Sequence, residues 1–181
     1  LIVFGGLGFL TWEDICTYRL DFHRYRMQSK VILVTTAFLL VLPTLYFYCF
    51  EFTAGSARQR ILLSMFQSVT PRTAGFNTAD LAAMDSTSQA LMVVLMLLGG
   101  SPSSTAGGMK TTTFAVLLAN MWATFRRRDD AEFFGRRIDG SAVKNAATIA
   151  GMYLTLFFLG AFVIAAAEQL PMSVCLYERS E

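Results

Sequence analysis

Two runs of small and polar residues are the parts of this sequence best suited to chemistry. The first run is Thr73, Ala74, Gly75, Phe76 and Asn77. A glycine here lets backbone carbonyl oxygens turn inward, and the threonine hydroxyl supplies one more oxygen. A cation that leaves water must regain such oxygens, because its dehydration in a dry interior costs on the order of tens of kcal/mol. The run therefore predicts a filter that binds a monovalent cation through carbonyls.

The second run combines glycine, serine and proline and cannot remain helical, because Gly and Pro are the poorest helix formers. Its members are Gly99, Gly100, Ser101, Pro102, Ser103, Ser104, Thr105, Ala106, Gly107 and Gly108, followed by Lys110. The run lies within a segment, 86–125, that would form a rod of about 60 Å, roughly twice the hydrocarbon thickness. Irregular backbone at that depth is tolerated only against protein or a wet cavity. We expect the run to line an aqueous path.

Lys110 has two possible roles. It could extend along a helix end to the membrane interface. It could instead lie at the wet loop, and this role is favoured because a charge at membrane depth costs about 2.5 to 3.5 kcal/mol. A phosphate-binding loop does not fit, because Met109 separates Gly108 from Lys110 where that motif needs adjacent Gly and Lys.

The composition predicts an all-α membrane protein that lies in a lipid bilayer. Of 181 residues, 54% are hydrophobic and 15% are charged, whereas about a quarter are charged in soluble domains. The apolar residues cluster in the runs 31–52, 91–98 and 146–167. A net charge of +2 gives no reason to expect nucleic acid, and three cysteines without paired spacing imply neither disulfides nor zinc.

Basic residues give the expected orientation. The stretch 12–30 holds four Lys or Arg and the stretch 126–144 holds six, together ten of the chain's fifteen. By the positive-inside tendency both stretches face the cytoplasm. The apolar runs that follow them are then expected to cross outward, and 86–125 to return.

These observations predict a helix, re-entrant helix, helix repeat of the potassium-channel type. We expect the following parts: the end of a preceding span at 1–11; a cytoplasmic loop at 12–30; a complete repeat at 31–125, with an outer helix 31–52, a pore helix 56–69, a filter 70–78 and a broken inner helix 86–125 that contains the loop 99–113; a cytoplasmic loop at 126–143; and the first helix and start of a pore helix of the next repeat at 144–181.

Two other functions compete with an ion pore. A membrane-embedded enzyme could use the Ser, Thr and Lys of the loop, but no His, Asp or Glu nearby could act as its base, so we expect no enzyme. A purely structural membrane subunit is the other possibility, and further filter-like turns upstream would argue against it.

The strings Ser68 to Thr78 and Gly99 to Thr113, in this order and spacing, resemble the Trk/Ktr/HKT superfamily of potassium transporters, closest to its bacterial KtrB branch. The resemblance covers essentially the whole chain. It implies four repeats around one pore, of which this chain holds the end of the second, all of the third and the start of the fourth. It also implies that the carbonyls of Thr73, Ala74, Gly75 and Phe76 bind K+, the transported ion, with no cofactor in this chain.

The same resemblance implies that the glycine-rich loop gates potassium flow just below the filter. It further implies a homodimer, a multi-pass location in a bacterial plasma membrane, and a cytoplasmic ring of nucleotide-binding subunits of the KtrA or TrkA type. Arg126, Arg127 and Arg128 are the expected coupling residues for that ring, although the positive-inside tendency alone also explains them. Three of the four filter loops are not in this chain, so a sodium-permeable transporter of the same fold stays an alternative.

Overall fold

The computed structural model describes residues 2–19, 21–72, 84–104, 107–128 and 130–168. The described part is nearly all helical, as the composition predicts. Its elements are α1 (Ile2–Gly6), α2 (Phe9–Tyr18), the 3-10 turn η1 (Phe22–Arg24), α3 (Met27–Tyr46), the π-helical turn η2 (Phe47–Glu51), α4 (Ala57–Val69), α5 (Ser86–Leu97), α6 (Thr111–Phe125), β1 (Glu132–Phe133), β2 (Arg136–Arg137) and α7 (Gly140–Glu168). The two strands form a small antiparallel hairpin.

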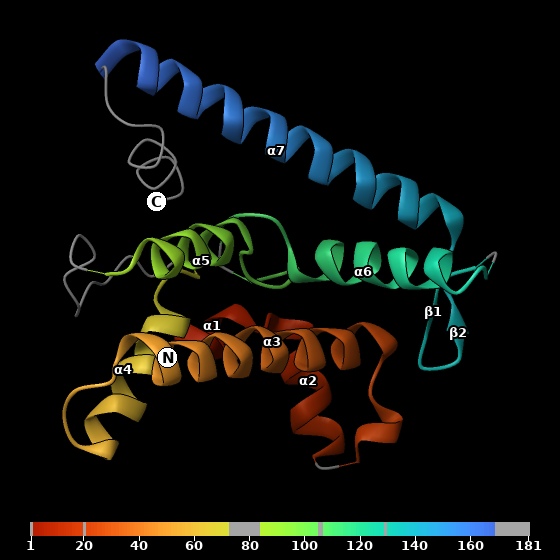
Figure 1. Cartoon of the computed structure of the whole chain (residues 1–181). Helices are drawn as coiled ribbons and strands as arrows, with labels where there is room; N and C mark the ends of the chain where they lie inside the picture. Colours follow the sequence, from red (N-terminus) through yellow and green to blue (C-terminus); the bar gives the residue numbers. More distant parts are fainter. Residues whose placement is uncertain (1, 20, 73–83, 105–106, 129, 169–181) are drawn as a thin grey trace.

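The helices are arranged around the pair α5 and α6, which lie end to end (Figure 1). Helix α3 runs alongside this pair and packs against α4 and α6, while α7 packs against α6 from the other side. Two segments are long and apolar enough to cross a membrane: Met27–Glu51, with mean hydropathy 2.1, and Gly140–Ala167, with mean hydropathy 2.2.

Proline shapes the end of helix α3. Pro43 lies inside the helix and cannot donate the backbone hydrogen bond that its position requires. The next turn widens into the π-helical segment η2, a form in which hydrogen bonds reach one residue further. This turn carries Phe47 into the interior, where it is fully buried.

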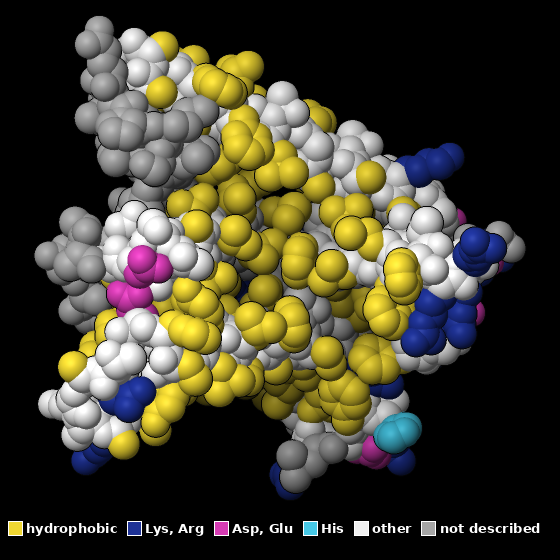
Figure 2. Space-filling model, viewed as in Figure 1, with side chains coloured by type: hydrophobic (Ala, Val, Ile, Leu, Met, Phe, Trp, Pro, Cys, Tyr) yellow, Lys and Arg dark blue, Asp and Glu magenta, His cyan; other side chains and the backbone are white. Residues whose placement is uncertain are grey.

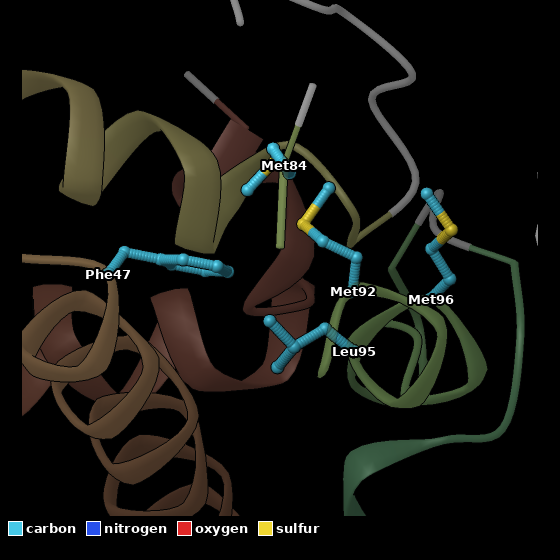
Figure 3. Close-up of a cluster of buried hydrophobic side chains, with 5 residues drawn as sticks. All are labelled: Phe47, Met84, Met92, Leu95 and Met96. Carbon is cyan, nitrogen blue, oxygen red and sulfur yellow. The ribbon is translucent and has the colours of Figure 1, made fainter. Parts of the chain in front are cut away.

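Phe47 lies in a buried cluster that joins the end of α3 to α5 (Figure 3). The cluster consists of Phe47, Met84, Met92, Leu95 and Met96, with Tyr46, Phe52 and Leu91 packed around it. Burial of each such side chain contributes about 1.5 to 3 kcal/mol. The cluster therefore fixes the start of the α5–α6 pair.

Large apolar side chains also cover much of the outer surface. Figure 2 shows hydrophobic side chains over the middle of one face and Lys and Arg gathered at the end where the hairpin lies. On α7 the exposed apolar side chains are Ile149, Met152, Leu154, Leu156, Phe158, Leu159, Phe162 and Val163. Contiguous apolar surface of this kind is rare on soluble monomers and is suited to lipid or to further membrane helices.

Several boundaries differ from those expected. The stretch 12–30, expected to be a loop, contains most of α2, the turn η1 and the start of α3, and α7 begins at 140 where the sequence indicated 144. Residues 111–113, expected to be loop, form the first turn of α6. Within this polar stretch Asp14 is buried, and its carboxylate accepts a hydrogen bond from the backbone N–H of Arg26 at 3.0 Å.

Candidate functional site at the helix break

Helix α4 begins with a capping box. The Ser56 hydroxyl accepts a hydrogen bond from the Gln59 backbone N–H at 3.4 Å, and the Gln59 side chain accepts one from the Ser56 N–H at 3.3 Å. Two backbone donors that have no partner within the helix are thereby satisfied. The start of α4 is thus encoded locally.

Arg60 ties α4 to the end of α3. Its guanidinium donates to the carbonyls of Phe52 at 2.5 Å and Tyr48 at 2.9 Å, and lies 4.5 Å from the centre of the Tyr48 ring. The carbonyls at a helix end lack partners within the helix and carry partial negative charge, so a cation there is favourable. These contacts fix the position of the start of α4 relative to the end of α3.

The polar side of α4 faces protein and its apolar side faces outward. Ser64, Gln67 and Ser68 are buried, whereas Ile61, Leu62 and Met65 are exposed. The hydroxyls of Ser68 and Thr44, on α3, lie 2.8 Å apart and share a hydrogen bond. A soluble amphipathic helix has the opposite arrangement, so α4 is suited to apolar surroundings.

Arg72 connects the end of α4 to the break between α5 and α6. Only 8% of this residue is exposed, and its Nη2 donates to the Gly99 carbonyl at 3.4 Å. Its Nε has no hydrogen-bond partner within the described ranges. A small cavity beside it is lined by residues of α1, α3, α4 and the break: Ile2, Val3, Gly6, Thr36, Leu40, Val69, Arg72 and Gly100.

The predicted filter residues Thr73, Ala74, Gly75, Phe76 and Asn77 lie outside the described residues. The chain enters this segment directly after Arg72. Arg72, the last described residue before this segment, contacts Gly99 of the second run.

Residues 98–110 form the connection between α5 and α6, and its two ends lie together. The Gly99 N–H donates to the Met109 carbonyl at 2.9 Å, and the Met109 N–H donates to the Leu97 carbonyl at 3.1 Å. A Cβ on Gly99 would lie inside contact distance of the Gly107 carbonyl oxygen, and Gly108 has a φ of +73°. Glycine is required at both positions for steric reasons.

The first half of this connection packs into a second break, at the beginning of the chain. Helices α1 and α2 are separated at Gly8, which has a φ of +76°. The Ser101 N–H donates to the Gly6 carbonyl at 3.0 Å, the Ser101 hydroxyl donates to the same carbonyl at 2.5 Å, and the Phe9 N–H donates to the Ser103 carbonyl at 3.4 Å. We call residues 6–9 the seat of the loop.

The remaining loop residues are less enclosed. Pro102 and Ser104 are half-buried, and the Ser104 hydroxyl donates to the Ser101 carbonyl at 2.6 Å. Gly107 and Gly108 are exposed, and Lys110 is half-buried at the N-cap position of α6. Thr105 and Ala106 lie outside the described residues.

The three arginines expected to contact a partner are exposed at the C-terminal end of α6. The Arg126 guanidinium lies 4.8 Å from the centre of the Trp122 ring, and the Arg128 N–H caps the helix by donating to the Ala123 carbonyl at 2.9 Å. Arg127 has a φ of +54°. The side chains therefore lie at the polar end of the molecule, away from the loop.

Lys30 and Asp139 organise the same polar end. The Lys30 ammonium donates to the His23 carbonyl at 2.9 Å and lies 5.7 Å from the Phe22 ring centre and 5.9 Å from that of Phe134, in the hairpin. Hydrogen bonds from the Ser141 side chain and then from its backbone lower the pKa of Asp139 below 3.8. The Lys30 contacts join the turn before α3 to the hairpin, while the Asp139 contacts are local to the start of α7.

The sequence did not reveal two features of this site, the seat and the partner of Arg72. A signal for the seat is present as Gly5-Gly6-Leu7-Gly8 within an apolar run, which resembles the glycine pairs of the loop. Across the described ranges, no cluster of three or more His, Cys, Asp or Glu is placed to bind a metal ion. The oxygen atoms at the break that could bind a cation belong to backbone carbonyls and to hydroxyl groups.

Comparisons of this chain with known proteins agree on one protein family. Residues 20–177 match the TrkH family, described as a cation transport protein. The chain is 39% identical to the potassium/sodium uptake protein NtpJ of Enterococcus hirae over 179 residues, which is 94% of this chain and 39% of that protein.

Two further relatives belong to potassium uptake systems. The chain is 32% identical over 184 residues to the Ktr system potassium uptake protein B of Bacillus subtilis, and 31% identical over 185 residues to the protein of the same name from Vibrio alginolyticus. Each alignment covers 98% of this chain and 41% of the relative. The chain thus spans about two fifths of the length of these relatives.

Proposed function

We propose, from the premise that this chain belongs to the TrkH family of cation transport proteins, that it supplies one complete pore repeat of a potassium-conducting membrane transporter. The observation that carries the proposal is the contact of Arg72 with Gly99. It connects the last described residue before the 73–77 segment to the break between two apolar helices. A filter and an irregular loop beside it are the parts that a gated cation pore needs.

In this proposal the carbonyls of Thr73, Ala74, Gly75 and Phe76 replace the water that K+ loses, and Asn77 completes the filter segment. Dehydration costs on the order of tens of kcal/mol, whereas the negative end of helix α4 contributes about 0.3 to 2 kcal/mol. The helix end can therefore tune the entry of a cation, but the carbonyls must provide the selectivity. The relatives support potassium as the ion, since their names include potassium uptake.

A second candidate is a pore that also admits sodium. The relative with 39% identity is named a potassium/sodium uptake protein, and one repeat of several does not determine the selectivity of a whole pore. Competition of sodium with rubidium uptake separates the two candidates. Uptake that sodium leaves unchanged favours a potassium-selective pore.

The loop 99–108 with Lys110 is the proposed gate, and the exposed Arg126, Arg127 and Arg128 are the proposed contacts for a cytoplasmic ring of nucleotide-binding subunits. The position of these arginines at the polar end of α6, which begins where the loop ends, supports a mechanical connection. We further propose a homodimeric, multi-pass protein of a bacterial plasma membrane. The two long apolar segments support the membrane location.

Gly75→Asp in the full-length transporter tests the filter. A side chain and a charge at this position should abolish rubidium uptake or remove its selectivity, while the assembled protein still elutes at its normal size. Gly151→Ala is the matched control, because a Cβ at Gly151 on α7 would meet open space. Unchanged uptake and selectivity in the Gly75 variant would contradict the proposed filter.

A further inference from the structure

We infer that Gly8 is a positioning residue for the loop, and that the seat at residues 6–9 holds the loop in the position that restricts cation flux. The inference rests on the proposed function, because it assumes that the loop lies in the ion path. It adds a specific restraint, located in the chain before α3, on which the position of the loop depends.

The first argument is the density of hydrogen bonds between two segments that are 95 residues apart. Ser101 is fully buried, and both its N–H and its hydroxyl donate to the Gly6 carbonyl. The Phe9 N–H donates to the Ser103 carbonyl at the same place. Buried polar groups of this kind leave a substantial penalty if their partner moves away, so the loop is held by the seat.

The second argument is that only glycine fits at position 8. Its φ of +76° is one that L side chains rarely adopt, and a Cβ there would lie nearer than 3.0 Å to the Pro102 carbonyl oxygen. The same Cβ would lie 3.3 Å from the Ser101 hydroxyl. The closest obstacle is backbone, which cannot rotate away as a flexible side chain can. An added methyl group must therefore displace the loop or the seat.

The third argument is that the seat itself is braced. The Trp12 indole N–H donates to the Phe4 carbonyl at 3.0 Å and its ring stacks on that of Phe4, with centroids 5.2 Å apart, so α1 and α2 are joined across the break. In the middle of α2, the Asp14 carboxylate accepts the Arg26 N–H. The seat is thereby connected to the chain that enters α3.

The fourth argument is that the loop is also fixed on its other side. Arg72 donates to the Gly99 carbonyl, two residues before Ser101. Residues 99–103 are thus held between the end of α4 and the seat. A displacement of this half of the loop away from α1 and α2 breaks its hydrogen bonds to Gly6 and Phe9.

The test uses Gly8→Ala in the complete transporter with its regulatory subunits. Because the seat stabilises the restricting position, its loss should raise the Vmax of rubidium uptake roughly three- to tenfold, the factor that loss of one hydrogen bond gives in a two-state equilibrium, with KM unchanged. Gly151→Ala on α7 is the control. Its Cβ would have nothing within 4 Å and the residue lies outside the seat and the loop, so Vmax should stay within about twofold of the parent.

A second measurement does not depend on transport. Hydrogen exchange of the amides of Phe9 and Ser101 should be faster in Gly8→Ala than in the parent and in Gly151→Ala. Unchanged exchange, or faster exchange with unchanged Vmax, would overturn the inference. A parent protein that takes up no rubidium at all would instead contradict the proposed function, and the two failures are therefore distinguishable.

Ser101→Ala provides an independent variant if Gly8→Ala does not fold. It removes the hydroxyl that donates to Gly6 but keeps the backbone N–H that donates to the same carbonyl. It should raise Vmax in the same direction with KM unchanged. A Vmax equal to that of the parent in a folded Ser101 variant would overturn the assignment.

Discussion

The Arg72 guanidinium donates a hydrogen bond to the carbonyl of Gly99, 27 residues further along the chain. This contact joins the residue before the predicted ion-binding residues, Thr73 to Asn77, to the first glycine of the predicted gate. The donor is nearly completely buried, so the charge is kept away from water at some cost. A buried charge of this kind is expected where it holds a backbone segment in place, and the first prediction follows from this contact.

Arg72→Met should raise the Vmax of rubidium uptake about fivefold, because the lost charge-assisted hydrogen bond helps to hold the loop in the position that restricts flux. The methionine keeps much of the length and apolar body of the side chain but leaves the Gly99 carbonyl without this donor. Initial uptake rates, normalised to the amount of assembled protein, measure the effect. Arg58→Met is the control, because Arg58 lies exposed on α4. Equal uptake in both variants would show that Arg72 does not position the loop.

The base of the loop gives a prediction about stability. Gly99→Ala should lower the free energy of unfolding by about 1 to 3 kcal/mol, because its Cβ would collide with the Gly107 carbonyl oxygen. Gly107→Ala changes a glycine of the same loop but would have nothing within 4 Å of its Cβ. Thermal unfolding in detergent compares the two variants. A Gly107 variant as unstable as the Gly99 variant would show that glycine flexibility, and not this close approach, is what the loop needs.

Asp139, at the start of α7, gives a prediction about pH. The Ser141 hydroxyl donates to its carboxylate at 2.6 Å and is the main cause of its lowered pKa. Because the pKa is lower in the folded than in the unfolded protein, the contribution to stability is present above the ordinary value of 3.8 and is lost as pH falls through the folded value. The start of α7 should therefore loosen in acid.

Ser141→Ala should raise the pKa of Asp139 toward its ordinary value and reduce the acid-dependent part of the stability. The measurement is the difference in unfolding temperature between neutral and acidic buffer for the parent, Ser141→Ala and Asp139→Asn. The last variant cannot titrate at this position and sets the baseline. A parent whose acid dependence equals that of Asp139→Asn would contradict the assignment.

The parts of the fold that depend on local chemistry were predictable from the sequence. The glycine and proline run at 99–108 cannot be helical, and the structure has α5 end at Leu97 and α6 begin at Thr111. The all-helical class followed from the apolar composition. The charges of the stretch 12–30 predict a loop, whereas the structure has most of α2 there, with Asp14 buried and bonded to the Arg26 N–H.

The parts that depend on distant contacts were not predictable. Nothing adjacent to Ser101 in sequence indicates that its hydroxyl bonds to Gly6, and nothing adjacent to Arg72 indicates that Gly99 is its partner. The sequence supplied the residue types, since a glycine in each run permits close backbone approach. The filter role of Thr73 to Asn77 stays a prediction, because these residues lie outside the described ranges.

Helix α4 has a consequence for how the protein is assembled. Its buried serines and glutamine meet side chains of α3 and of the α5 region, as in the Thr44–Ser68 hydrogen bond and the 3.4 Å contact between Gln67 Nε2 and Met92 Sδ. Alone in a bilayer, Gln67 would lose its contact with Met92, while Ser64 and Ser68 would keep only their bonds to carbonyls of α4 itself. The thirteen residues of the helix are also too few to cross. The order of biogenesis follows from this: the long helices must enter the membrane first, and α4 can pack against them only after they are inserted.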